Sequence, residues 1–153
     1  MAEALDPATH RRLGVDLYNK AWSLIEKEDR SREEDDELLH CAHASAYHWL
    51  QVGKQANRAR SEWQCSRVNV VLGRPEAAIA HAERCLELVE GAPDHMEEFD
   101  LPSAYEALAR AHALAGDGAR AKQFHDLGLA ATSVMKDEDD RRHLEEDFST
   151  IRL

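Results

Sequence analysis

The chain has 153 residues, enough for one domain with a sizeable core, and 43% apolar with 32% charged residues is typical of a globular protein. Its apolar runs fall far short of the roughly 20 residues that a membrane-spanning helix needs, and its N-terminal segment lacks the basic start and apolar centre of an export signal, so we expect a cytoplasmic protein with no membrane span. The net charge is −11, and the acids gather in two stretches, 26–37 and 137–147, which would repel a long polyanion and so disfavour nucleic acid as a partner.

Capping signals and apolar spacing predict three helices in the first half of the chain. They cover about residues 6–28, 31–53 and 57–72. Asp6 followed by Pro7 is a strong helix start, and Ser31 with Glu34 three residues later forms a capping box. Gly73 is expected to end the third helix, because glycine adopts the left-handed conformation that commonly closes a helix.

Four more helices are predicted in the second half, at about residues 75–91, 100–116, 118–136 and 137–153. Pro75 marks the start of the first of these, and Asp100 and Asp137 are expected N-caps of two others. The last helix has an apolar face opposite an acidic one, with the apolar residues Leu144, Phe148 and Ile151. This pattern is typical of a helix that caps the open end of a repeat array.

Two segments, 72–79 and 115–122, share one pattern of a glycine, a short turn and a helix with an early alanine. The glycines Gly73 and Gly116 are 43 residues apart. A recurring turn of this kind indicates stacked helical hairpins that bury apolar faces against their neighbours. We therefore predict one all-α domain, residues 1–153, with hairpins at about 7–53, 57–91 and 100–136.

The third to sixth predicted helices, two hairpins at about 57–91 and 100–136, resemble tetratricopeptide repeats, the second hairpin more closely than the first. The residues that carry the resemblance are Tyr105, Leu108, Ala109, His112 and Ala121. The first segment has matching small residues but no large aromatic at the corresponding position, and the spacing of 43 exceeds the 34 usual for the family. The run 43–53 also resembles small uncharacterised bacterial repeat proteins. The resemblance implies a right-handed superhelical stack of three hairpins plus a C-terminal capping helix.

Such repeats bind partners on a concave face formed by the first helix of each hairpin. The resemblance places six residues of this chain there: Arg60, Trp63, Arg67, Ser103, Glu106 and Arg110. Each set of three has spacings of three and four residues and so forms one stripe on its helix. Arginine forks bind carboxylates, and an indole beside them offers an apolar wall. The hypothesis is a non-catalytic module, without a cofactor, that binds a protein, a peptide or an acidic segment in an arginine-lined groove.

Alternatives to this hypothesis remain open. Trp63 can be a core residue, and Glu106 can neutralise Arg67 or Arg110 across the hairpins. His40 and His43 lie on one flank of the second helix and could supply two ligands to a metal-dependent enzyme, with a third from elsewhere. The ends of so short an array are also expected to pair as a homodimer or larger homo-oligomer.

Overall fold

The computed structural model describes residues 3–153, and regular structure in that range consists of helices, with no strand. The α-helices are α1 (Pro7–Ile25), α2 (Arg32–Val52), α3 (Gln55–Val71), α4 (Pro75–Gly91), α5 (Asp100–Leu114), α6 (Gly118–Ser133) and α7 (Glu138–Ser149), with a short 3₁₀ helix, η1 (Pro93–His95), between α4 and α5. The all-α class and the seven predicted helices are confirmed. None of the described helices has the length and apolarity to cross a bilayer.

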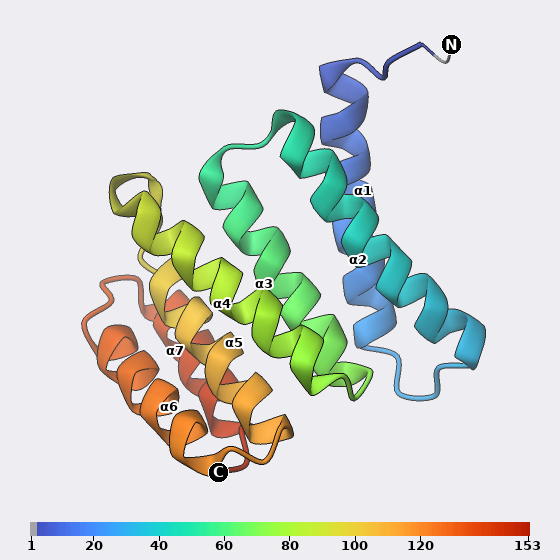
Figure 1. Cartoon of the computed structure of the whole chain (residues 1–153). Coiled ribbons are helices and arrows are strands. Elements are labelled where there is room, and N and C mark those ends of the chain that lie inside the picture. The colour runs from blue at the N-terminus through green and yellow to red at the C-terminus, as the bar shows by residue number, and fades with distance from the viewer. Residues whose placement is uncertain (1–2) are drawn as a thin grey trace.

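Consecutive helices pair into three hairpins, α1 with α2, α3 with α4 and α5 with α6 (Figure 1). The first helices of successive hairpins also contact one another, α1 against α3 and α3 against α5. Helix α7 follows the third hairpin and packs against both of its helices. Helices α1 and α7 therefore lie at opposite ends of the stack.

The two predicted glycine turns have the same geometry. Gly73 and Gly116 have φ of 71° and 79°, the left-handed region that side chains other than glycine rarely adopt. In each turn the residue after the glycine donates its N–H back across the turn, from Arg74 to the carbonyl of Asn69 (2.8 Å) and from Asp117 to that of His112 (3.0 Å). These are Schellman caps, and their equivalence shows that the two hairpins turn in the same way.

The predicted N-caps are largely confirmed. Asp6 accepts the Thr9 N–H, Ser31 and Glu34 form the capping box, and Asp137 accepts the Asp140 N–H. Asp100 is not the cap of α5, because it is the first residue inside that helix and its carboxylate is used elsewhere.

Helix ends were predicted less accurately than helix starts. Helix α1 ends at Ile25 rather than near residue 28, because the guanidinium of Arg30 donates to the carbonyls of Leu24, Ile25 and Lys27 and so caps the helix there. Helix α6 ends at Ser133 rather than at 136, where the chain turns and the side chain of Met135 enters the core.

Small buried residues occupy corresponding positions in the second and third hairpins. Ser66 and Ala78 are fully buried between α3 and α4, and the Ser66 hydroxyl donates to the Ala78 carbonyl at 2.8 Å. Ala109 and Ala121 are the corresponding buried pair between α5 and α6.

The apolar face of α7 is buried as predicted. Leu144 and Phe148 pack with Ala109 and Met135 in one core cluster. Ile151 joins this cluster from beyond the helix, because α7 ends at Ser149 rather than at residue 153. The ring of Phe148 lies directly against Gly128 of α6, where even a methyl group would collide with it. This close contact fixes α7 against the third hairpin.

Candidate binding groove

A cavity of about 320 Å³ opens among α1, α3, α5 and α7, the helices that follow one another along one side of the stack. Its walls are mostly apolar and come from five helices and the residue before α5. The lining residues are Tyr18, Ala59, Arg60, Trp63, Cys85, Val89, Phe99, Asp100, Ser103, Asp140, His143, Leu144 and Asp147. A concave site with aromatic walls and a few charged groups is the usual form of a ligand pocket.

Arg60 lies in the wall of this cavity but is already paired. Its Nε and Nη2 each donate to one carboxylate oxygen of Asp100, both at 2.9 Å. Asp100 is buried and also accepts the Glu97 N–H at 2.8 Å, while the ring of Phe99 lies 4.9 Å from the Arg60 guanidinium carbon. The guanidinium of Arg60 is therefore held in a two-bond ion pair within the chain, which connects α3 to α5.

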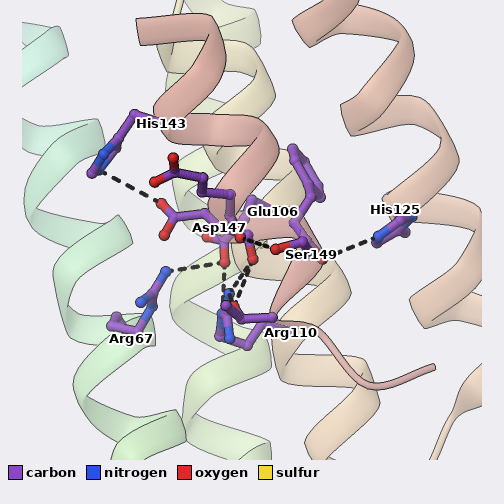
Figure 2. A network of polar contacts seen from close by, with 10 residues as sticks. Arg67, Glu106, Arg110, His125, His143, Asp147 and Ser149 are labelled. Atoms are coloured by element: carbon purple, nitrogen blue, oxygen red, sulfur yellow. Dashed lines mark hydrogen bonds and ion pairs between the residues drawn. The ribbon is translucent and has the colours of Figure 1, made fainter. Parts of the chain in front are cut away.

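Arg67 and Arg110 share one buried carboxylate, that of Glu106 (Figure 2). Glu106 Oε1 accepts from Arg67 Nη2 at 3.0 Å and from Arg110 Nε at 2.6 Å. Arg110 Nη2 also donates to the Asp147 carbonyl and to the Thr150 hydroxyl at the end of α7. The cluster thus connects α3, α5 and α7, and it adjoins the cavity rather than lining it.

Trp63 is the principal aromatic wall of the cavity on α3. Its indole contacts the ring of Trp22, with centroids 5.6 Å apart, and the guanidinium carbon of Arg67 lies 5.3 Å from the centre of the Trp63 ring. The Nε1–H of Trp63 is buried and has no hydrogen-bond partner, and the same is true of Glu106 Oε2. Buried polar atoms without partners are rare in folded proteins and gather at functional sites.

Helix α7 contributes two carboxylates, those of Asp140 and Asp147, and the imidazole of His143 to the opposite wall. The Asp147 carboxylate lies 4.0 Å from His143 Nε2 (Figure 2). Burial raises the pKa of Asp147, and the neighbouring charge of Glu106 raises it further, against the opposing effect of Arg67, His143 and Arg110.

The six residues expected in the groove therefore fall into two groups. Arg60, Trp63 and Ser103 line the cavity, whereas Arg67, Glu106 and Arg110 form the adjoining ion cluster. The interpretation of Glu106 as a neutralising partner fits the observed bonds, to both Arg67 and Arg110. Five other residues of the site were not predicted from the sequence: Tyr18, Phe99, Asp100, Asp140 and Asp147. Asp100 lies three residues before Ser103, so helical spacing could have identified it. The others come from α1, from α7 and from the residue before α5, outside the two predicted stripes.

The two histidines proposed for a metal site, His40 and His43, have different surroundings. Among residues 3–153, no three side chains of His, Cys, Asp or Glu form a group suited to a metal ion. His40 is exposed, and His43 lies beside His81, with ring centroids 5.1 Å apart. Burial lowers the pKa of His43, and the nearby imidazole of His81 lowers it further. His81 itself contacts the Glu62 carboxylate at 2.6 Å.

The three cysteines, Cys41, Cys65 and Cys85, are all buried and unpaired by disulfides. Burial raises the pKa of Cys65 to about 12 and raises that of Cys85 further still. Cys85 lies in the cavity wall, but its thiol stays protonated near neutral pH and is a poor nucleophile.

No protein-family model, curated protein or solved structure matches this chain. The cavity and its neighbouring charges are thus the features from which function can be inferred.

Proposed function

We propose that the protein is a non-catalytic interaction module that holds a peptide segment of another protein in the cavity among α1, α3, α5 and α7. The observation that carries the proposal is the cavity itself, because its walls come from all three hairpins and from α7. A volume of about 320 Å³ suits one or two side chains of a bound segment rather than a large cofactor.

The proposal includes a tetratricopeptide-like, right-handed arrangement of the hairpins. Three features support it: the contacts among the first helices of the hairpins, the matching left-handed glycines, and the matching pairs of small buried residues. In arrays of this kind the first helices of the hairpins form the binding face. The cavity lies on those helices.

The chemistry of the cavity supports binding more than catalysis. Its one thiol is protonated near neutral pH, and its arginine is held by Asp100. The metal-dependent alternative through His40 and His43 gains no support from the positions of these side chains. A cytoplasmic location and a homodimer stay predictions.

The proposal is tested by filling the cavity. Ser103 lines it and is half-buried, so Ser103→Trp is expected to place an indole in the space that a peptide side chain would occupy. Peptides selected from a random display library on the parent protein should bind Ser103→Trp at least about tenfold more weakly, a loss of about 1.4 kcal/mol. Fluorescence anisotropy measures the affinity, and circular dichroism checks the fold.

Ser133→Trp is the matched control, because Ser133 is exposed at the end of α6 and lies outside the cavity. It should bind the selected peptides as the parent does. Equal binding of those peptides to the parent and to Ser103→Trp would contradict the proposal.

A further inference from the structure

The charged groups around the cavity include one more carboxylate than guanidinium group. Four carboxylates lie in its walls or in the adjoining cluster, those of Asp100, Glu106, Asp140 and Asp147. Against them stand three guanidinium groups, those of Arg60, Arg67 and Arg110. All three guanidinium groups are bonded to Asp100 or Glu106, which leaves the carboxylates of α7 as the charges still available to a ligand.

Asp147 is the carboxylate best placed to meet that ligand. Its side chain is 28% exposed and lines the cavity, and the His143 imidazole that faces it lies at 4.0 Å, beyond hydrogen-bond distance. Arg67 and Arg110 also act on the Asp147 charge, but both guanidinium groups donate to Glu106. A half-buried carboxylate without a close partner costs folding free energy, and such departures from good packing are typical of binding sites.

The remaining walls are apolar and aromatic. Trp63 and Phe99 stand on the side of α3 and α5, and Leu144 lies on α7 next to the acidic residues. A ligand that fills this space therefore needs an apolar body as well as a positive charge. An anionic segment would meet Asp140 and Asp147 while the arginines were already occupied, and like charges at such distances repel.

We propose that the cavity binds a basic–aromatic peptide segment, in which one lysine or arginine reaches Asp147 while a neighbouring aromatic side chain packs against Trp63. The proposal rests on the function proposed above and specifies its partner. It reverses the charge expected from the arginine stripe, because that stripe is neutralised by acids of the same chain.

The test uses three peptides that differ in one residue. They are acetyl-Ala-Ala-Phe-Lys-Ala-amide and the same sequence with Gln or Glu in place of Lys. Each is titrated into ¹⁵N-labelled protein, and the indole N–H resonance of Trp63 is followed, identified by its loss in Trp63→Phe. The Lys peptide should shift this resonance saturably and bind about 5–10-fold more tightly than the Glu peptide, with the Gln peptide between them.

Asp147→Asn should reduce the difference between the Lys and Glu peptides to about twofold or less. Its melting temperature should equal or exceed that of the parent, because the substitution removes a carboxylate whose ionised form burial disfavours. Asp139→Asn is the matched control: it makes the same change on the same helix, but Asp139 is exposed and outside the cavity. This variant should keep the full preference for lysine.

Three results would overturn the inference. One is equal or tighter binding of the Gln or Glu peptide, which leaves peptide binding in place but refutes the positive charge. Another is the absence of any Trp63 shift with the Lys peptide. An unchanged preference for lysine in Asp147→Asn is a third such result, because it refutes the role of Asp147. Failure of the broader function is distinguished by the Ser103→Trp comparison, which uses library-selected peptides and assumes no charge.

Discussion

His112 is a buried histidine whose surroundings disfavour its charged form. Its side chain is almost fully buried and stacks on Phe124, with ring centroids 5.7 Å apart and planes 14° apart. Burial lowers the pKa of His112 below 6.5, although the nearby carboxylate of Asp117 acts in the opposite direction. The unfolded chain therefore binds this proton more readily than the folded one does.

Because folding lowers the pKa of His112, we predict that acid destabilises the folded protein. The stabilising effect of a neutral His112 is fully present above pH 6.5 and is lost as the pH falls from there through the folded-state pKa. Between about pH 7.5 and about pH 5, the free energy of unfolding should therefore fall less in His112→Phe than in the parent, as measured by urea denaturation. His95→Gln, at an exposed site, should behave as the parent does. An equal loss in the parent and in His112→Phe would contradict this account.

The turns between helices allow a direct test of backbone conformation. Gly73 and Gly116 have positive φ, whereas Gly118 does not, and all three have open space where a methyl group would be added. Gly73→Ala and Gly116→Ala should each destabilise the protein by about 1–2 kcal/mol, because a side chain disfavours the left-handed conformation. Gly118→Ala should be neutral or slightly stabilising. Chemical denaturation measures these differences, and equal effects at the three sites would show that φ is not the cause.

Helix starts were predictable because the signals are local. Asp6, Ser31 and Asp137 each bond an N–H three residues away, so the sequence around each cap contains the whole interaction. The end of α6 was not predictable in this way. The N–H of Lys136, just beyond that end, bonds the carboxylate of Glu98, a residue 38 positions earlier, and no pattern within α6 contains that information.

At the scale of the whole molecule, Glu106 holds three helices together through its two arginines and the contact of Arg110 with the end of α7. Glu106→Gln leaves two partly buried guanidinium groups without their counter-charge and should lower the free energy of unfolding by about 2–4 kcal/mol. Urea denaturation measures the loss. Glu138→Gln, an exposed change of the same type at the start of α7, should alter stability by less than about 0.5 kcal/mol. Comparable losses in both variants would contradict a special role for Glu106.

The candidate site was only partly predictable, because the groups that pair in it are far apart in the sequence. The stripe of Arg60, Trp63 and Arg67 follows from helical spacing within α3. The acids that neutralise it lie about 40 residues away in α5, and Asp147 lies further still. Composition reveals an excess of acids but not which of them faces a given arginine. The change from an expected anion-binding groove to a proposed cation-binding one depends on this pairing.

The reactivity of Cys85 can be used to measure how often the cavity opens. Its thiol is 2% exposed and lies in the cavity wall, which α7 helps to close. A thiol-reactive dye therefore reaches Cys85 when α7 lifts or the neighbouring helices separate. The rate at which Cys85 itself is labelled, read from its peptide by mass spectrometry to separate it from Cys41 and Cys65, measures the frequency of that opening. A peptide seated against Trp63 should slow this labelling, so occupancy of the cavity can be followed without any probe attached to the partner.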